Sequence, residues 1–251
     1  MPSISQAEMQ AVQDSGFEPL ELSYETVHQF SSQRLLLRSA LTIHSLDVGV
    51  LEQAQYRYVA RRTSQSQQLF DRQLQKVLEQ LPELLKQRKQ IEAVTIPIYN
   101  RMLKKGNLAA SIFDALTRFP QVSPQMLCVE VSGDILFEEL EPLTAELQRV
   151  KNMGVKIAVW ELGDPFCPLL RLSQIPCDYL ILDSHPVSWL MEDREAEFRS
   201  LCDFLHRDEK IRIFAPEIPD GALCPKLEAL GCDGYSLAPD APLPETEEGD
   251  A

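Results

Sequence analysis

Three short apolar segments, separated by helical patterns, constrain the fold of this chain more than any other feature. The segments span residues 127–131, 155–160 and 177–182, and each ends at a polar or acidic residue. Short apolar strands that alternate with amphipathic helices predict a parallel sheet. In parallel α/β folds the carboxyl ends of the strands hold the ligand and the catalytic groups. The residues at these three strand ends are therefore the first candidates for a functional site.

The same alternation extends over most of the chain and predicts a closed barrel. Residues 22–30 and 34–42 are expected to form an antiparallel hairpin around the turn-like sequence Ser31-Ser32-Gln33. Further strands are expected at 91–98, 211–214 and 234–237, and helices at 51–62, 67–87, 108–119, 134–150, 188–206, 222–230 and between 163 and 177. Seven or eight strand–helix units indicate an α/β fold of the (β/α)8 barrel type with one antiparallel strand.

The chain divides into three regions by composition. Residues 1–20 are polar and are expected to form an N-terminal arm, either loose or as a short helix. Residues 21–238 are expected to form the barrel domain. Residues 239–251 are rich in proline and acidic residues and have little apolar surface to bury, so a disordered acidic tail is expected.

The charge of the chain argues against two classes of partner. Its 24 basic and 38 acidic residues give a net charge of −14. Proteins bind nucleic acids through clusters of Lys and Arg that release counterions, so no nucleic-acid partner is expected. Anionic membrane surfaces attract the same basic clusters. No apolar run approaches the roughly 20 residues that span a bilayer, and no membrane association is expected.

Cysteine usage and the first residues of the sequence predict a cytoplasmic protein. The six cysteines contain no CxxC pair and no spacing typical of a zinc site or a disulfide framework. Free, reduced thiols are therefore expected. Residues 1–16 lack the basic-then-apolar pattern of a signal peptide.

Two neighbouring segments carry a resemblance to a known family. Residues 154–163 read Gly-Val-Lys-Ile-Ala-Val-Trp-Glu-Leu-Gly, which resembles the Gly-Val-x-Ile-Ala-Leu-Asp-Asp-Phe-Gly segment of EAL-domain cyclic di-GMP phosphodiesterases. Residues 175–183 resemble the Leu-Pro-Val-Asp-x-Leu-Lys-Ile-Asp segment that follows it. Weaker matches occur in the family's order at 34–41, 49–51, 127–132, 214–219 and 229–235, so the similarity spans about 22–238. The family's barrel with one antiparallel strand agrees with the fold predicted above.

The resemblance implies hydrolysis of a phosphodiester by two metal ions, which activate water and neutralise the developing charge. Hard divalent cations take carboxylate and amide oxygens as ligands. The Glu that gives the family its name falls on Arg38, and the strand Asn falls on Pro97. The Glu of the third strand is retained as Glu130, whereas its second acid, a little further on, is Gly133.

The remaining family positions are also largely replaced. The metal-bridging Asp pair falls on Trp160 and Glu161, and the Lys that orients water falls on Ile181. The Asp after that Lys is retained as Asp183. The rest of the pocket is expected from Pro216, which replaces the Glu of Ala-Glu-Gly, its neighbour Glu217, and Asp233, which stands for the closing Gln.

These replacements predict a vestigial pocket with no catalytic residue, no metal site and no cofactor. Each lost group typically costs about 10²–10⁴ in rate, and loss of the metals removes the mechanism. The acids Glu130, Glu161, Asp183, Glu217 and Asp233 are expected at the barrel mouth, either as hydrogen-bonded remnants or as a rearranged metal site. Arg38 is expected to pair with Glu130 in place of the missing cation. For Trp160, packing in the pocket and stacking on a guanine base remain alternatives.

Three functions follow from the sequence, in order of preference. The first is a catalytically inactive EAL-like domain that acts in signalling by binding an unidentified protein. The second is a receptor that binds cyclic di-GMP weakly without hydrolysis, although the family's phosphate-binding Arg after Glu-Ala-Leu is Thr42 here. The third is an enzyme with altered metal ligands. The sequence leaves a homodimer open.

Overall fold

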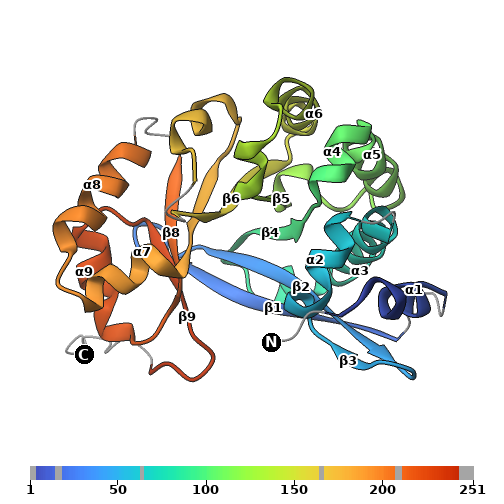
Figure 1. Cartoon of the computed structure of the whole chain (residues 1–251), viewed down its shortest axis with the longest axis horizontal. Coiled ribbons are helices and arrows are strands. Elements are labelled where there is room, and N and C mark those ends of the chain that lie inside the picture. Colours follow the sequence, from blue (N-terminus) through green and yellow to red (C-terminus); the bar gives the residue numbers. More distant parts are fainter. Residues whose placement is uncertain (1–3, 15–18, 63–64, 164–166, 207–210, 243–251) are drawn as a thin grey trace.

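Eight strands close into a barrel around a buried core, and a ninth short strand extends the sheet. The computed structural model describes residues 4–14, 19–62, 65–163, 167–206 and 211–242. The strands of this part are β1 Leu20–Gln29, β2 Leu35–Ser45, β3 Gly49–Leu51, β4 Ile91–Pro97, β5 Leu127–Ser132, β6 Lys156–Leu162, β7 Tyr179–Leu182, β8 Arg212–Ile218 and β9 Gly234–Leu237. Their order is β1-β9-β8-β7-β6-β5-β4-β2-β3, and pairing of β1 with β2 closes the ring (Figure 1). The predicted barrel is confirmed.

Helices surround the barrel on its outer face (Figure 1). The α-helices are α1 Gln6–Asp14, α2 Gln53–Arg62, α3 Gln65–Gln87, α4 Asn100–Lys105, α5 Leu108–Arg118, α6 Leu140–Asn152, α7 Ser184–Ser188, α8 Glu195–Leu205 and α9 Cys224–Ala229. Short 3-10 helices occur at η1 Pro124–Met126, η2 Gly133–Phe137, η3 Leu169–Gln174, η4 Trp189–Met191 and η5 Gly221–Leu223. No helix within the described ranges is both long enough and apolar enough to cross a bilayer.

Strand β1 is the antiparallel strand of the barrel and provides its closure. It pairs antiparallel with β2 along most of its length and with β9 over two residues, whereas β4 to β9 pair in parallel. A Cβ atom at Gly234 would overlap the carbonyl oxygen of His28, so a side chain there would separate β9 from β1. Glycine is therefore required at this point of closure.

The barrel interior is built from alternate residues of each strand, because successive side chains of a strand point to opposite faces. The buried side chains of its middle layer are mostly small or apolar: Val27, Leu36, Ala93, Cys128, Ala158, Tyr179, Ile181 and Phe214. Two residues further along their strands, towards the carboxyl ends, lie Arg38, Glu130 and Trp160. The strand pattern thus directs these three side chains inward.

A polar network, which we call the Glu92 network, lies at the amino ends of the parallel strands. The Glu92 carboxylate accepts hydrogen bonds from Lys156 Nζ at 2.5 Å, Arg212 Nη2 at 2.6 Å, Tyr179 Oη at 2.5 Å and Gln29 Nε2 at 2.9 Å. Glu92 is only 9% exposed. The apolar middle layer therefore lies between this network and the polar groups at the carboxyl ends.

Several predicted elements are confirmed, among them the opening hairpin, the helix now seen as α3, and strand β5. The N-terminal arm contains α1, whose Met9 and Val12 are fully buried, and Ile4 donates a backbone hydrogen bond to Gln55 of α2 at 3.2 Å. All six cysteines are free thiols, as expected. Of the predicted disordered tail, residues 243–251 lie outside the described part of the chain.

Three helix predictions are wrong in detail. The helix expected from residue 134 begins at Leu140, because Ser132 caps the 3-10 helix η2 by accepting from the backbone N–H of Asp134. In place of the helix expected over 188–206, the structure has the end of α7 at Ser188, then η4, and then α8 from Glu195. Between residues 167 and 177 the structure has only η3. Helix α4 was not predicted.

Candidate functional site

A pocket of about 760 Å³ opens at the carboxyl ends of the parallel strands. Its walls come from the strand ends, from β1 and β2, and from α2. Nine of the ten predicted site residues line it: Arg38, Pro97, Glu130, Trp160, Glu161, Ile181, Asp183, Pro216 and Glu217. Most of the predicted site residues therefore lie together in one pocket, which we call the mouth pocket.

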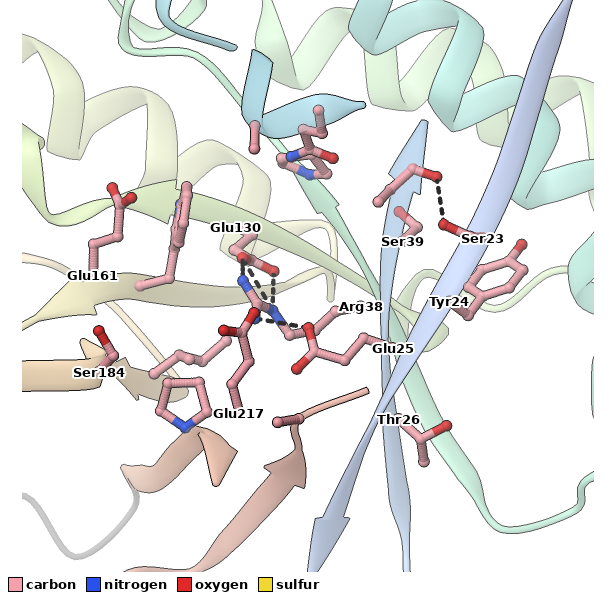
Figure 2. Close-up of a pocket in the computed structure, with 18 of the residues that line it drawn as sticks. Ser23, Tyr24, Glu25, Thr26, Arg38, Ser39, Glu130, Glu161, Ser184 and Glu217 are labelled. Atoms are coloured by element: carbon pink, nitrogen blue, oxygen red, sulfur yellow. Dashed lines mark hydrogen bonds and ion pairs between the residues drawn. The ribbon is translucent and has the colours of Figure 1, made fainter. Parts of the chain in front are cut away.

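Arg38 lies between two carboxylates at the base of the mouth pocket (Figure 2). Its Nη2 atom donates to Glu130 Oε1 at 2.5 Å, and its Nε atom lies 3.2 and 3.3 Å from the two oxygens of Glu130. Its Nη1 atom donates to Glu25 Oε2 at 3.0 Å. The predicted pairing of Arg38 with Glu130 is confirmed, and Glu25 is a second partner that the sequence analysis missed.

Glu130 has no oxygen left without a donor. Thr95 Oγ1 donates to its Oε2 atom at 2.6 Å, in addition to the bonds from Arg38. The side chain of Glu130 is 4% exposed, so this carboxylate depends on its protein partners for compensation. Burial lowers the pKa of Arg38, but the charges of Glu130 and Glu25 outweigh it and raise the pKa above the ordinary value. Arg38 is therefore a permanent cation.

The donor set of the mouth pocket does not fit a pair of divalent cations. Both oxygens of Glu130 accept hydrogen bonds, and a guanidinium lies where the resemblance places a metal-binding Glu. Among the residues that the structure describes, no cluster of three or more His, Cys, Asp or Glu is arranged to hold a metal ion. The positive charge beside Glu130 and Glu25 is the guanidinium of Arg38.

Trp160 lies beside two guanidinium groups. The Cζ atom of Arg57, on α2, is 4.8 Å from the centroid of the indole, and that of Arg38 is 5.7 Å away. Arg57 also forms an ion pair with Glu161 at 2.8 Å, and Ser132 Oγ donates to the same carboxylate at 3.0 Å. Both cations lie within the distance at which an aromatic ring attracts positive charge. The helix α2 is thereby linked to the end of β6.

Two glutamates of the mouth pocket have left-handed backbone conformations. Glu161 has φ of 58° and Glu217 has φ of 48°. Each lies where the strand register shifts, between Val159 and Leu162 in β6 and between Ala215 and Ile218 in β8. Such irregularities re-aim side chains at the ends of strands. The backbone N–H of Glu217 donates to Ser236 Oγ at 2.9 Å, and this bond holds the irregular part of β8 in place.

Gly133 occupies the position of the second acid of the third family strand, and the structure leaves no room for a side chain there. A Cβ atom would lie 2.9 Å from the carbonyl oxygen of Glu161 and 3.2 Å from that of Trp160. The irregular end of β6 therefore requires glycine at this position. A carboxylate cannot be accommodated at residue 133 unless the backbone of β6 moves.

Gly133→Ala is expected to lower the free energy of unfolding by about 1–3 kcal/mol, because overpacking against backbone atoms forces a local shift. Urea unfolding of the two proteins measures this difference. The exposed neighbour Glu139, whose side chain makes no capping hydrogen bond, provides a control, and Glu139→Ala is expected to change stability by less than about 0.5 kcal/mol. Equal stability of Gly133→Ala and the unmodified chain would contradict the steric argument.

Asp233 does not lie at the mouth, contrary to the prediction. It directly precedes β9, and a residue before a parallel strand lies at the amino end of the barrel. Its carboxylate accepts a hydrogen bond from the backbone N–H of Ile213 at 2.7 Å and contacts His206 Nε2 at 2.9 Å. Asp233 therefore joins β8, β9 and the end of α8 instead of lining the pocket.

Sequence comparison assigns the chain to a family. A family model described as the EAL domain matches residues 9–236. The chain belongs to the EAL domain family. A search among curated proteins found no match.

Solved structures share the fold. The MucR phosphodiesterase in complex with c-di-GMP has a TM-score of 0.79 at 19% identity, with 95% of this chain and 96% of that chain covered. The FimX EAL domain from Pseudomonas aeruginosa bound to c-di-GMP has a TM-score of 0.77 at 14% identity, with 92% of each chain covered. The EAL enzyme Bd1971, bound to cAMP and cyclic di-GMP, has a TM-score of 0.79 at 18% identity. The match covers 92% of this chain and 63% of Bd1971.

Proposed function

We propose that this chain is a catalytically inactive EAL domain that acts in signalling by binding a protein partner. The observation that carries this proposal is the guanidinium of Arg38, held by Glu25 and Glu130 at the base of the mouth pocket. Two-metal hydrolysis needs cations that contact both the attacking water and the phosphate. A fixed arginine in place of a carboxylate ligand repels such cations. It also pairs with Glu130, so that this carboxylate is not available as a metal ligand.

Two further positions support the absence of turnover. Ile181, 2% exposed and packed with Phe214 and Tyr179, has no group that could orient a water molecule. Trp160 places an indole where the resemblance implies a carboxylate that bridges two metals. Both replacements put apolar bulk beside the position where negative charge would develop, and such charge needs preorganised donors or cations.

The charge of the mouth pocket weighs against the second candidate, a cyclic di-GMP receptor. Five carboxylates and two guanidinium groups line the pocket, which leaves a net charge of −3. Cyclic di-GMP carries two phosphodiester charges of the same sign, and both guanidinium groups are already paired with carboxylates. The indole of Trp160 is a feature that favours a stacked guanine base, although Arg57 already lies 4.8 Å from its ring centre.

The purified chain is expected to hydrolyse cyclic di-GMP at least about 10⁴-fold more slowly than the MucR phosphodiesterase assayed in parallel, with millimolar Mg²⁺ or Mn²⁺. Chromatographic separation of linear and cyclic dinucleotides measures the rate. Turnover that EDTA abolishes and that Glu130→Gln also removes would refute the proposal. Calorimetric binding at micromolar concentration without turnover would instead select the receptor.

A further inference from the structure

The mouth pocket contains more hydrogen-bond acceptors than its own residues can satisfy. Among the described residues, neither Asp183 nor Glu217 forms an ion pair, although both line the pocket. The Oε1 atom of Glu25 and the Oε1 atom of Gln53 are buried there and accept no hydrogen bond within the described part of the chain. Buried acceptors of this kind are uncommon because each costs free energy when it has no donor.

The two guanidinium groups of the pocket do not supply the missing hydrogen-bond donors. Arg38 is held at the base by Glu25 and Glu130, and Arg57 is held at the side by Glu161. The two carboxylates outside these ion pairs are Glu217 of β8, whose charge acts on Arg38, and Asp183 at the end of β7, which caps α7. Figure 2 shows Glu217 facing the Arg38–Glu25 pair, with Ser184, next to Asp183, at the neighbouring strand end. The open part of the pocket is therefore anionic.

The pocket also shows how it holds a guanidinium group. Arg57 is one third exposed, enters from α2, lies 4.8 Å from the centre of the Trp160 ring and pairs with a carboxylate. An arginine that enters from outside would find carboxylates of the same kind at Asp183 and Glu217, whereas Glu161 and the Trp160 ring are already in contact with Arg57. A guanidinium group presents five N–H donors in a plane, which suits a site with several separate acceptors.

We propose that the mouth pocket binds an arginine side chain from a basic segment of a partner protein. Asp183 and Glu217, which both line the open pocket, pair with the entering guanidinium. This inference rests on the proposed function, because it names the chemistry of the protein partner. The net charge of −14 supports it, since such a charge attracts basic segments at long range.

The test uses the full chain and a synthetic octapeptide with four repeats of Gly-Arg, acetylated and amidated at its ends. Trp160 and Trp189 are the two tryptophans, so Trp189→Phe leaves the fluorescence of Trp160 as a reporter in the pocket. We expect a saturable fluorescence change on titration with the arginine peptide. The dissociation constant is expected to rise with NaCl concentration, and a glutamate peptide of the same length is expected to give no response.

Paired variants separate specific binding from general attraction to an acidic protein. Asp183→Asn with Glu217→Gln is expected to weaken binding at least about tenfold, and asparagine preserves the cap that Asp183 gives to α7. Glu141→Gln with Glu228→Gln removes the same charge from exposed positions outside the pocket and is expected to change affinity less than about twofold. Thermal melting of both variants checks that each is folded.

Three results would overturn this inference. They are a lack of saturable binding, an equal loss of affinity in both double variants, and competition in which micromolar cyclic di-GMP displaces the peptide from Trp160. The proposed function fails separately, through metal-dependent turnover of cyclic di-GMP. An inactive chain that ignores the arginine peptide would refute this inference and leave the absence of catalysis intact.

Discussion

Arg38→Ala is expected to lower the free energy of unfolding by about 3–5 kcal/mol, the typical cost of removing one partner from a buried ion pair. The reason is that Glu130, 3% exposed, would keep its charge but lose the cation that compensates it. For a domain of this size such a loss lowers the melting temperature by about 10 °C. Calorimetry or circular dichroism on heating measures it.

Two variants control this experiment. Arg57→Ala removes a guanidinium that is 34% exposed from a pair with Glu161, which is 26% exposed, and exposed pairs contribute at most about 1 kcal/mol. Arg38→Met combined with Glu130→Leu removes both charges and is expected to recover much of the stability. If Arg38→Ala were no less stable than Arg57→Ala, Arg38 would not be the structural replacement for a cation.

Glu92→Gln is expected to have a similar effect at the other end of the barrel, again about 3–5 kcal/mol. Glu92 compensates Lys156 and Arg212 together, at 2.5 and 2.6 Å, and both would lose their carboxylate. Urea unfolding at neutral pH measures the loss. Glu83→Gln is a suitable control, because Glu83 is exposed on α3 and its ion pair is with Lys86, which is also exposed. Equal midpoints for the two variants would show that the network is not stabilising.

The Glu92 network also predicts how stability depends on pH. Burial raises the pKa of Glu92, but hydrogen bonds from Arg212, Lys156 and Tyr179 outweigh it and hold the pKa far below its ordinary value. A carboxylate with a depressed folded-state pKa stabilises the fold above its unfolded-state pKa of about 4.3 and loses that contribution as the pH falls. The unmodified chain should therefore lose stability below about pH 5 more steeply than Glu92→Gln does.

Much of the fold could be predicted because the pattern of strands and helices is local. The apolar runs that became β4, β5, β6 and β7 are short and are followed by helical patterns, and β4 is also rich in β-branched residues. Inward and outward side chains alternate along each strand. A family motif matched to a strand therefore predicts which side chains point into the barrel and which lie at its carboxyl end. For this reason nine of the ten predicted site residues lie together in one pocket.

The missed features depend on geometry that the sequence does not specify. The hairpin was predicted, but its register was not, because the register follows from the turn and the turn sequence did not identify its type. Only the observed register pairs Glu25 with Arg38. Arg57 lies on a helix without a motif, and its role follows from how α2 packs over the strand ends. Asp233 was misplaced because the resemblance matched it to the closing Gln of the family. That match did not reveal that Asp233 directly precedes β9 and so lies at the amino end of the barrel.

The apolar middle layer of the barrel separates the Arg38 cluster from the Glu92 network, and the two groups share no residue. The amino-end network joins β1, β4, β6, β7 and β8 through side chains that take no part in the mouth pocket. The strand connections that this network makes at the amino ends therefore do not depend on the residues of the mouth pocket. Substitutions at the mouth pocket can therefore change what the pocket binds while the contacts at the amino ends hold the strands together.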